Sequence, residues 1–360
     1  MKKLLVLSAL VVSSIACKTE TKHPETTTTE TLTKVDELVT ITEVAEFTGQ
    51  QVTGVTVSEA GRVFVNFPRW RPTVKHSVTE VVNGQSIPFP NEHWNSWTPD
   101  TPLTDTTFVA VQSVVASQKE LFVVDTRNPF FKGVLSNPKL FVFDLENNTL
   151  KQTYTLPNEV FFKDSYINDV RIDRKNNVAY FTDSGHAGLL LLNLENGTFK
   201  RVLTDHISTT AETDHLTING KQWVNTVHSD GIALNQIDDV LYFHALTGYT
   251  LYAVSTAVLI NATEEEIAAA VEVVDKTAAP DGMIFDQSGN LYYADLENNA
   301  ILKRDLNGMT TTIAKGDSVR WADTFSIYNG DLYYTNSRIN EITGPIPTMT
   351  FQVNKIALKD

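Results

Sequence analysis

Acidic and amide side chains recur at one position of a repeated pattern in the sequence, at intervals of roughly 40 to 60 residues. They stand where a short apolar run begins, and they are Asn168 with Asp169, Asp230, Asp281 and Asp323. Oxygen donors of this kind bind hard cations such as Ca²⁺, and they bind protonated organic amines equally well. Where carboxyl groups crowd together without a cation, their pKa values rise and they can serve as acid or base. The pattern predicts a shared site if the fold brings the repeats together.

A structural role is the alternative for each aspartate taken singly. Asp230 and Asp281 precede a glycine, and Asp–Gly pairs often form turns in which the carboxylate accepts hydrogen bonds from nearby backbone N–H groups. Turns elsewhere in the repeat use Asn and Gly more freely. The recurrence of an acid at equivalent positions therefore favours the shared site.

Two further candidates lie close to these positions in the sequence. His228 precedes Asp230 by two residues and, with Asp230 and Asp281, is a candidate for proton transfer. Trp321 is expected either to form a wall of the pocket or to pack in the core. The ligand-binding candidates are Asn168, Asp169, Asp230, Asp281, Trp321 and Asp323. The candidates for a Ca²⁺ ion are Asp230 and Asp281.

An aromatic stretch near the start of the repeats contains Arg69 with Trp70, followed by Trp94 to Trp97. It is expected either to cover a central channel formed by the folded repeats or to pack against the outer strands of the first repeat. The sequence contains no G-x-S-x-G, no H-E-x-x-H, no phosphate-binding Gly-rich loop and no cysteine pair. Motifs alone thus leave the choice between an enzyme and a binding protein open.

The repeat itself predicts an all-β fold. Its clearest copy starts at Asp281 and reads DGMIFD, QSGN, LYYAD, LENNA, ILKRDL, NG and MTTTIAK, which are four β-type runs separated by turns. Five related copies start near Gly54, Val111, Asn168, Asp230 and Asp323. Six units with this spacing indicate a six-bladed β-propeller of four-stranded antiparallel blades.

The two ends of the domain are expected to close this ring. The last unit has three strand-like runs, whereas residues 37–47, ELVTITEVAEF, form a run left over before the first unit. Pairing the two would complete the sixth blade and remove exposed strand edges. One helix is expected, at residues 263–274, where Thr263 and Glu266 fit a capping box.

The N-terminal residues are typical of an export signal. Lys2 and Lys3 precede an apolar run at residues 4–12 and a short stretch of small residues before Cys17. We expect residues 1–16 to be an export signal peptide, Cys17 to be lipidated as in a bacterial lipobox, and residues 17–36 to be a Thr/Glu-rich tether. Ser14 departs from the Leu that such boxes usually carry. The propeller then spans residues 37–360, and the protein is a cell-envelope lipoprotein or is secreted.

The net charge of the chain limits the classes of binding partner that we expect. The formal net charge is −14, so nucleic acids and anionic membrane surfaces are disfavoured. We expect a small-molecule ligand, contact with a membrane only through the lipid anchor, and a monomer. The single cysteine excludes an intramolecular disulfide.

Several phrases of the sequence, in order, resemble the major royal jelly protein and Yellow family in its bacterial branch. They are GRVFVNFPRW, AVQSV with LFVVDT, YINDVRID with AYFTDSG, DHISTTAE, SDGIAL with LTGYTLYAV, PDGMIFD with LYYADLENNAI, and WADTFSIYNGDLYYT. The resemblance implies a six-bladed propeller. Its implications for activity are divided, because some members are linked to dopachrome conversion, some bind biogenic amines in the central cavity, and others are storage or signalling proteins.

A more distant resemblance links the chain to gluconolactonase and regucalcin-type propellers, which are metal-dependent hydrolases. Asn168–Asp169 is similar to their substrate-side Asn–Asp, Asp230–Gly231 stands where they use a metal-binding Asn–Gly, and Asp281 matches their metal-binding Asp. Their remaining ligand is a Glu before the first strand of blade one, where this chain reads QQVTGVTVS.

We therefore expect a propeller that binds a small cationic or aromatic molecule in its axial channel. The alternatives are a Ca²⁺-assisted lactone or ester hydrolase, and a dopachrome-type isomerase in which Asp230, Asp281 or His228 moves a proton.

Overall fold

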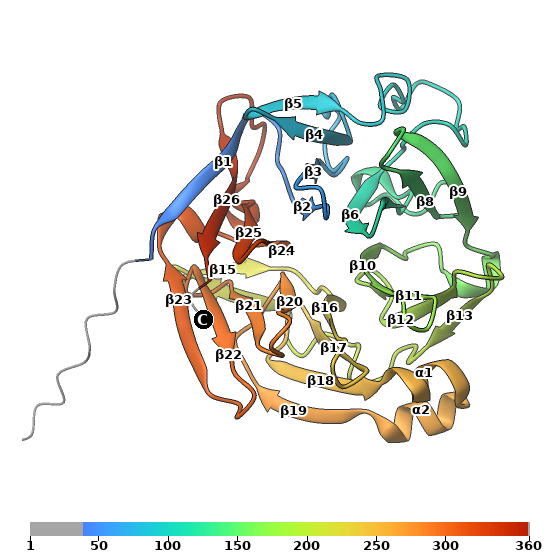
Figure 1. Ribbon diagram of the computed structural model, residues 1–360, viewed down its shortest axis with the longest axis vertical. Coiled ribbons are helices and arrows are strands. Elements are labelled where there is room, and N and C mark those ends of the chain that lie inside the picture. Colours follow the sequence, from blue (N-terminus) through green and yellow to red (C-terminus); the bar gives the residue numbers. More distant parts are fainter. Residues whose placement is uncertain (1–38, 359–360) are drawn as a thin grey trace, which may run out of the picture. The chain divides into compact units, whose positions relative to one another are not determined.

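The apolar runs of the repeat form six four-stranded antiparallel sheets in the computed structural model, which describes residues 39–358. The sheets stand side by side around one axis, and each places its first strand innermost (Figure 1). This confirms the predicted six-bladed β-propeller. The expected export signal, tether and Cys17 lie outside the described residues.

The first three blades follow the order of the chain. Blade one contains β2 (Gly54–Val57), β3 (Val63–Asn66), β4 (Val78–Val82) and β5 (Gln85–Pro88). Blade two contains β6 (Val111–Ser117), β7 (Glu120–Asp125), β8 (Lys139–Asp144) and β9 (Thr149–Thr155). Blade three contains β10 (Ile167–Asp173), β11 (Val178–Asp183), β12 (Gly188–Asn193) and β13 (Phe199–Val202).

The last three blades include the one that closes the ring. Blade four contains β16 (Ser229–Asn235), β17 (Val240–Ala245), β18 (Thr250–Ser255) and β19 (Glu272–Lys276). Blade five contains β20 (Met283–Phe285), β21 (Leu291–Asp295), β22 (Ala300–Arg304) and β23 (Thr310–Lys315). Blade six contains β24 (Phe325–Tyr328), β25 (Asp331–Asn336), β26 (Thr350–Ala357) and β1 (Ile41–Thr48).

Closure by the N-terminal strand is confirmed. β1 pairs antiparallel with β26, from Ile41 opposite Ile356 to Thr48 opposite Thr350, and the two strands lie side by side in Figure 1. β1 is the outermost strand of its blade, so the first and last strands of the ring share one sheet. Within residues 39–358, each of the six sheets of the closed ring therefore has four strands.

Insertions between the strands add a hairpin and a few short helices. The hairpin is β14 (His215–Ile218) with β15 (Lys221–Val224). The α-helices are α1 (Thr256–Asn261) and α2 (Glu264–Ala270), and the 3-10 turns are η1 (Pro129–Phe131), η2 (Asn158–Val160), η3 (Asp317–Val319) and η4 (Ile339–Glu341). The capping box of Thr263 and Glu266 is present, but the helix ends at Ala270 because β19 begins at Glu272. In residues 39–358, no helix is both long and apolar enough to cross a membrane.

The core consists of apolar layers between neighbouring blades. Along β11, Ala179 and Phe181 pack in the layer shared with blade two, whereas Val178 and Tyr180 pack in the layer shared with blade four. Both faces of the strand are buried, which explains why such second strands read as nearly continuous apolar runs. Away from the outer strands, such as β9 and β19, polar side chains reach open space mainly at the axis and in the loops.

Candidate functional site

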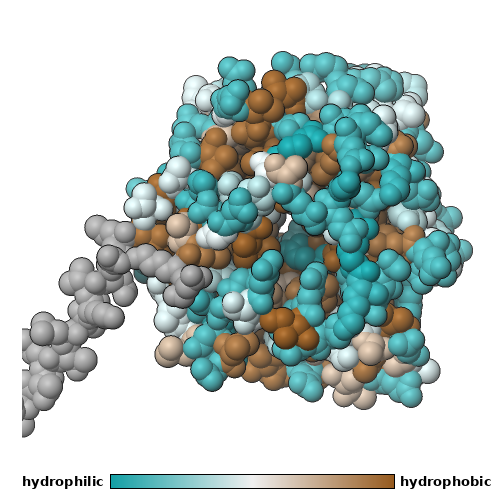
Figure 2. Space-filling view, viewed as in Figure 1, coloured by the Kyte–Doolittle hydropathy of each residue, from teal (hydrophilic) through white to brown (hydrophobic). Residues whose placement is uncertain are grey.

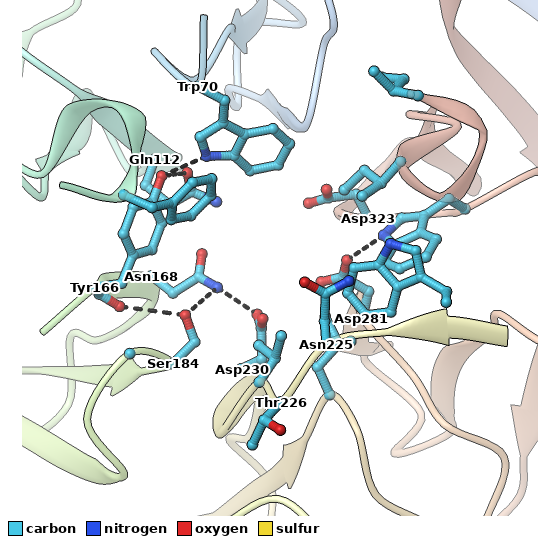
Figure 3. A pocket seen from close by; sticks show the side chains of 18 of the residues that line it. Trp70, Gln112, Tyr166, Asn168, Ser184, Asn225, Thr226, Asp230, Asp281 and Asp323 are labelled. Carbon is cyan, nitrogen blue, oxygen red and sulfur yellow. Dashed lines mark hydrogen bonds between the residues drawn. The ribbon is translucent and has the colours of Figure 1, made fainter. Parts of the chain in front are cut away.

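A cavity of about 510 Å³ lies at the end of the axis where the first strands begin (Figure 3). Its walls come from the starts of first strands, from loops between second and third strands, and from the segment after β15. The face seen in Figure 2 is hollowed near its centre, with hydrophilic residues around the hollow. The lining residues are Trp70, Arg71, Gln112, Phe131, Tyr166, Asn168, Ser184, Gly185, Trp223, Asn225, Thr226, Val227, Asp230, Leu246, Asp281, Trp321, Asp323, Ile339 and Ile342.

Most of the residues predicted from sequence meet at this cavity. Those that line it are Asn168, Asp230, Asp281, Trp321 and Asp323. Segments from blades three to six, far apart in the chain, are thus brought to one place by the repeat. Asp169 and His228, in contrast, are not among the lining residues.

The glycines after Asp230 and Asp281 have a role other than turn formation. A Cβ on Gly231 would lie 2.8 Å from the carbonyl oxygen of Asp281, and a Cβ on Gly282 would lie 2.8 Å from that of Asp323. Neither glycine has a positive φ angle. Each glycine therefore lets the backbone of the next blade come close, which draws successive aspartates together around the axis.

The cavity carboxyl groups have only neutral hydrogen-bond donors. The Asn168 amide donates to Asp230 Oδ1 at 2.7 Å. The Trp321 indole N–H donates to Asp281 Oδ2 at 2.6 Å. The Thr324 hydroxyl donates to Asp323 Oδ1 at 3.3 Å. Because none of these donors carries a charge, the carboxyl groups are uncompensated if they ionise.

Burial and mutual repulsion raise the pKa values of these groups. Burial is the larger cause at all three, and it raises the pKa of Asp230, Asp281 and Asp323 well above the ordinary value of an aspartate. Neighbouring carboxylates add to the rise: Asp281 acts on Asp230, and Asp323 acts on Asp281. A cation in the cavity would reverse this effect and favour ionisation.

Asp169 lies next to this group but has a partner of opposite charge. Its carboxylate lies 3.5 Å from the Arg171 guanidinium, and burial raises its pKa while Arg171 opposes that rise. Asp169 also contributes to the raised pKa values of all three cavity aspartates, which places it near them. Along β10 it stands between Asn168, at the cavity, and Arg171, which lies further down the channel.

His228 faces away from the shared site. Its Nδ1 accepts a hydrogen bond from the backbone N–H of Ala211 at 3.2 Å, and burial lowers its pKa. The charged groups that act on it are Asp183, at the end of β11, and Asp205, His186 and Asp164 nearby, none of which lines the cavity. The structure therefore offers no contact between His228 and the cavity aspartates that would support the predicted proton transfer.

Aromatic residues form the opposite wall, and sequence reasoning found only part of them. Trp70 and Phe131 lie 5.7 Å apart between ring centroids, and Phe131 and Tyr166 lie 4.9 Å apart. The Trp70 indole donates to the Tyr166 hydroxyl at 2.6 Å, which donates to Gln112 Oε1 at 2.8 Å. On the side of the aspartates, Trp223 packs edge-on against Trp321, the donor to Asp281, with 4.8 Å between the ring centroids.

The aromatic stretch noted in the sequence divides between the cavity and the core, where its buried tryptophans pack against residues of blade two instead of the outer strands of blade one. Trp70 lines the cavity, whereas Trp94 and Trp97 are buried in the core. Phe131 lies in the 3-10 turn η1, which carries no repeat signal, whereas Tyr166 precedes Asn168 by two residues, as Trp321 precedes Asp323. A sequence signal for Trp223 is the insertion between blades three and four that forms the hairpin β14–β15.

Two aromatic lining residues have backbones in the left-handed region. The φ angle is 55° at Phe131 and 62° at Trp321. Bulky residues rarely adopt this conformation, which costs on the order of 1–3 kcal/mol and concentrates at functional sites. At Trp321 the strained backbone accompanies the hydrogen bond that the indole makes to Asp281.

The residues present do not fit the Ca²⁺ site implied by the lactonase resemblance. In the part of the chain that the structure describes, no group of three or more acidic, His or Cys side chains could hold a metal ion. The segment before the first strand of blade one, residues 49–53, contains no carboxylate, and its Gln51 accepts a hydrogen bond at Oε1 from Arg71 at 2.8 Å.

Fold and site together define a six-bladed β-propeller with an acidic, aromatic-walled cavity on its axis. The sequence model of the family described as "Major royal jelly protein" matches residues 109–343, well over half of the chain. The chain belongs to the major royal jelly protein family. Major royal jelly protein 3 of Apis mellifera is 25% identical over 153 residues, which are 41% of this chain and 28% of that protein. The match thus spans less than a third of this relative.

Solved structures show the same fold. A luciferin-regenerating enzyme has a TM-score of 0.57 at 11% identity, covering 89% of this chain and 95% of that one. The gluconolactonase of Xanthomonas campestris has a TM-score of 0.55 at 12% identity, covering 89% of each chain. The calcium-binding protein regucalcin of Agrobacterium tumefaciens has a TM-score of 0.54 at 14% identity, covering 89% and 96%. At such low identities the likeness concerns the fold alone.

Proposed function

We propose that this protein is an exported cell-envelope propeller that binds a small protonated amine with an aromatic ring in its axial cavity. The observation that carries the proposal is the pairing of two unlike walls. Asp281 and Asp323 lie on one side of the cavity, across from Trp70 and Tyr166, with Asp230 between the two sides (Figure 3).

The acidic wall favours a cation. Three neighbouring carboxyl groups with neutral donors repel one another once ionised, and a bound ammonium group relieves that repulsion. Charge-assisted hydrogen bonds of this kind contribute roughly 1.5–3 kcal/mol each. The volume of about 510 Å³ is in the range of small-molecule pockets, so the cavity can hold an aryl amine rather than a bare ion.

The aromatic wall favours a ring on the ligand. Trp70, Phe131 and Tyr166 present a row of ring surfaces, and stacking of aromatic pairs contributes about 0.5–1.5 kcal/mol beyond burial. Gln112 is held by Tyr166 through its carbonyl oxygen, which leaves its amide N–H groups for an oxygen on the ring. A catechol or phenol ring carries such an oxygen.

A proton-transferring isomerase is the second candidate. One observation favours it: aspartates with raised pKa values stand side by side, so one can donate a proton while a neighbour accepts one. The hydrolase alternative has less support, because the residues at the cavity do not fit the metal on which such enzymes depend.

Calorimetric titration with dopamine tests the proposal. We expect dopamine to bind, and the neutral analogue 3,4-dihydroxyphenylethanol to bind at least about tenfold more weakly. Asp281→Asn and Asp230→Asn should each weaken dopamine binding by about tenfold or more. Asp164→Asn removes the same charge from an exposed side chain and should leave binding unchanged.

Two results would overturn this function. Equal binding of dopamine and its neutral analogue would remove the role of the carboxyl groups. Robust Ca²⁺-dependent lactone hydrolysis, abolished by Asp281→Ala, would replace the binding protein by an enzyme.

The export part of the proposal rests on the sequence of residues 1–36. Lipidation of Cys17 would hold the propeller at a membrane, so Cys17→Ala should release it into a soluble fraction. Identical fractionation of the variant and the wild type would contradict this.

A further inference from the structure

The axial channel holds a second cavity, of about 400 Å³, where the first strands end. β10 shows the relation between the two: Asn168, near its start, lines the first cavity, whereas Arg171 and Ile172 line the second. Most of the other lining residues are apolar, and they include Val115, Leu234 and Phe285. The second cavity thus combines an apolar wall with the guanidinium of Arg171.

Arg171 is held in place but is not saturated. Its Nη1 donates to the Val170 carbonyl at 2.7 Å, and its Nη2 donates to the Met283 carbonyl of blade five at 2.9 Å. The contact with Asp169 is longer, at 3.5 Å, and the buried Nε has no hydrogen-bond partner. A guanidinium has five N–H groups, so these contacts leave donors free.

The carboxylate that lines the second cavity is, in contrast, fully engaged. Asp286 Oδ1 accepts hydrogen bonds from the backbone N–H groups of Ser288 and Asn290, at 2.9 and 2.8 Å. Its Oδ2 accepts from the Asn290 amide at 2.8 Å and from the Tyr292 hydroxyl at 3.2 Å. Four donors tie this carboxylate into its own turn. Of these two charged lining residues, Arg171 is therefore the one that has hydrogen-bonding groups left for a ligand.

We propose that the second cavity is a binding site for a small organic anion, a carboxylate with an apolar body. The carboxylate would accept hydrogen bonds from Arg171, and the apolar body would cover Val115, Leu234 and Phe285. The second N–H of Nη1 is free to donate a charge-assisted hydrogen bond to a carboxylate oxygen. The proposal is independent of the amine site, because it uses other residues and a ligand of opposite charge.

Binding of 3-phenylpropionate, measured by calorimetry or by ligand-detected NMR, tests the site. Its neutral analogue, 3-phenylpropionamide, has the same ring and chain but lacks the charge. We expect phenylpropionate to bind at least about tenfold more tightly than the amide. Failure of phenylpropionate to bind, or equal binding of the two, would overturn the proposal.

A matched pair of surface variants locates the binding. Ile237 lines the second cavity and is 58% exposed, so Ile237→Asp adds a repelling charge without disturbing the core. It should weaken phenylpropionate binding by about tenfold. Met309→Asp adds the same charge at a residue that is 62% exposed and does not line the cavity, and it should have little effect. Equal effects of the two variants would contradict the assignment.

The role of Arg171 needs a variant that preserves the balance of buried charge. Arg171→Gln alone leaves Asp169 without its counter-charge and can unfold the protein. The double variant Arg171→Gln with Asp169→Asn removes both charges. It should lose the preference for phenylpropionate over the amide while still binding the amide, and retention of the preference would overturn the proposal.

Discussion

Buried aspartates occupy two different positions in the blades, with opposite surroundings. Asp125 and Asp183 end the second strands β7 and β11, and both are completely buried. Asp230, Asp281 and Asp323 stand where first strands begin and are 4% to 8% exposed. Residue type and burial are therefore nearly the same in the two sets.

Their partners differ sharply. Asp183 accepts hydrogen bonds from the Ser165 hydroxyl at 2.5 Å and from the backbone N–H of Tyr166 at 2.8 Å, and it forms an ion pair with Arg201 at 2.9 Å. Asp125 accepts hydrogen bonds from the backbone N–H groups of Val109 and Ala110, each at 2.8 Å. Each cavity aspartate has at most one or two neutral donors. Carboxylates whose oxygens already accept several hydrogen bonds hold loops in place. Carboxylates with few donors remain available to a ligand.

The largest expected effect comes from removing a saturated carboxylate. Asp183→Ala leaves the buried Arg201 without its counter-charge and leaves several N–H groups without an acceptor. We expect a loss of about 3–5 kcal/mol in the free energy of unfolding, measured by chemical denaturation. Asp281→Ala should cost far less, because it removes a carboxyl group that its neighbours repel. Similar losses in the two variants would erase the distinction.

The pH dependence of stability should separate the sets further. The raised pKa values of Asp230, Asp281 and Asp323 mean that the native protein retains protons that the unfolded chain has lost. The stability that these groups contribute is therefore fully present below the ordinary aspartate pKa and is lost as the pH rises through the raised values. Replacing all three by Asn should remove this loss, making the ligand-free variant more stable than wild type at pH 7.

Denaturation curves at several pH values check this expectation. The gain in stability of the triple variant should grow as the pH rises from about 4 and then level off. The exposed Asp164→Asn variant serves as the control and should show no such trend. A triple variant that is less stable than wild type at pH 7 would show that these carboxylates are structural after all.

The smallest expected effect on stability comes from removing single hydroxyl groups that donate hydrogen bonds to the two kinds of aspartate. Ser165→Ala removes a hydroxyl that lies 2.5 Å from Asp183, and Thr324→Val removes one that lies 3.3 Å from Asp323. We expect a loss of about 1–3 kcal/mol for the serine variant and less than about 1 kcal/mol for the threonine variant, by thermal or chemical denaturation. A reversed order would mean that Asp323 depends on its donor more than Asp183 does.

Sequence reasoning reached the fold and the acidic half of the site because both are properties of the repeat. The period-two runs and their turns locate the strands, and equivalent positions such as Asp230 and Asp281 converge by the symmetry of the ring. Closure by β1 followed from counting strand-like runs at the two ends. In the first strand of blade three, Asn168 lines the cavity, whereas its neighbour Asp169 contacts a different partner, Arg171.

The aromatic half could not be predicted in the same way. Phe131 and Tyr166 belong to loops whose course depends on contacts with other blades, and the positive φ angle of Phe131 follows from no local preference. His228 shows the converse limit, because a short distance in sequence from Asp230 did not place it on the same side of the backbone. The saturated Asp125 and Asp183 were visible in LFVVDT and YFTDSG, but only their hydrogen bonds reveal their role.

Ring closure also sets an order of events during folding. Most strand pairs join neighbours in the chain, so five blades can assemble as local meanders with little loop-closure entropy to overcome. The pairing of Ile41 with Ile356 joins the two ends of the domain, and it cannot form before nearly the whole chain is present. During synthesis β1 is made before every other strand of the ring but has to wait for its partner, β26. Until they meet, both strands expose an unpaired edge, so this interval is when the chain is most open to pairing with another copy of itself.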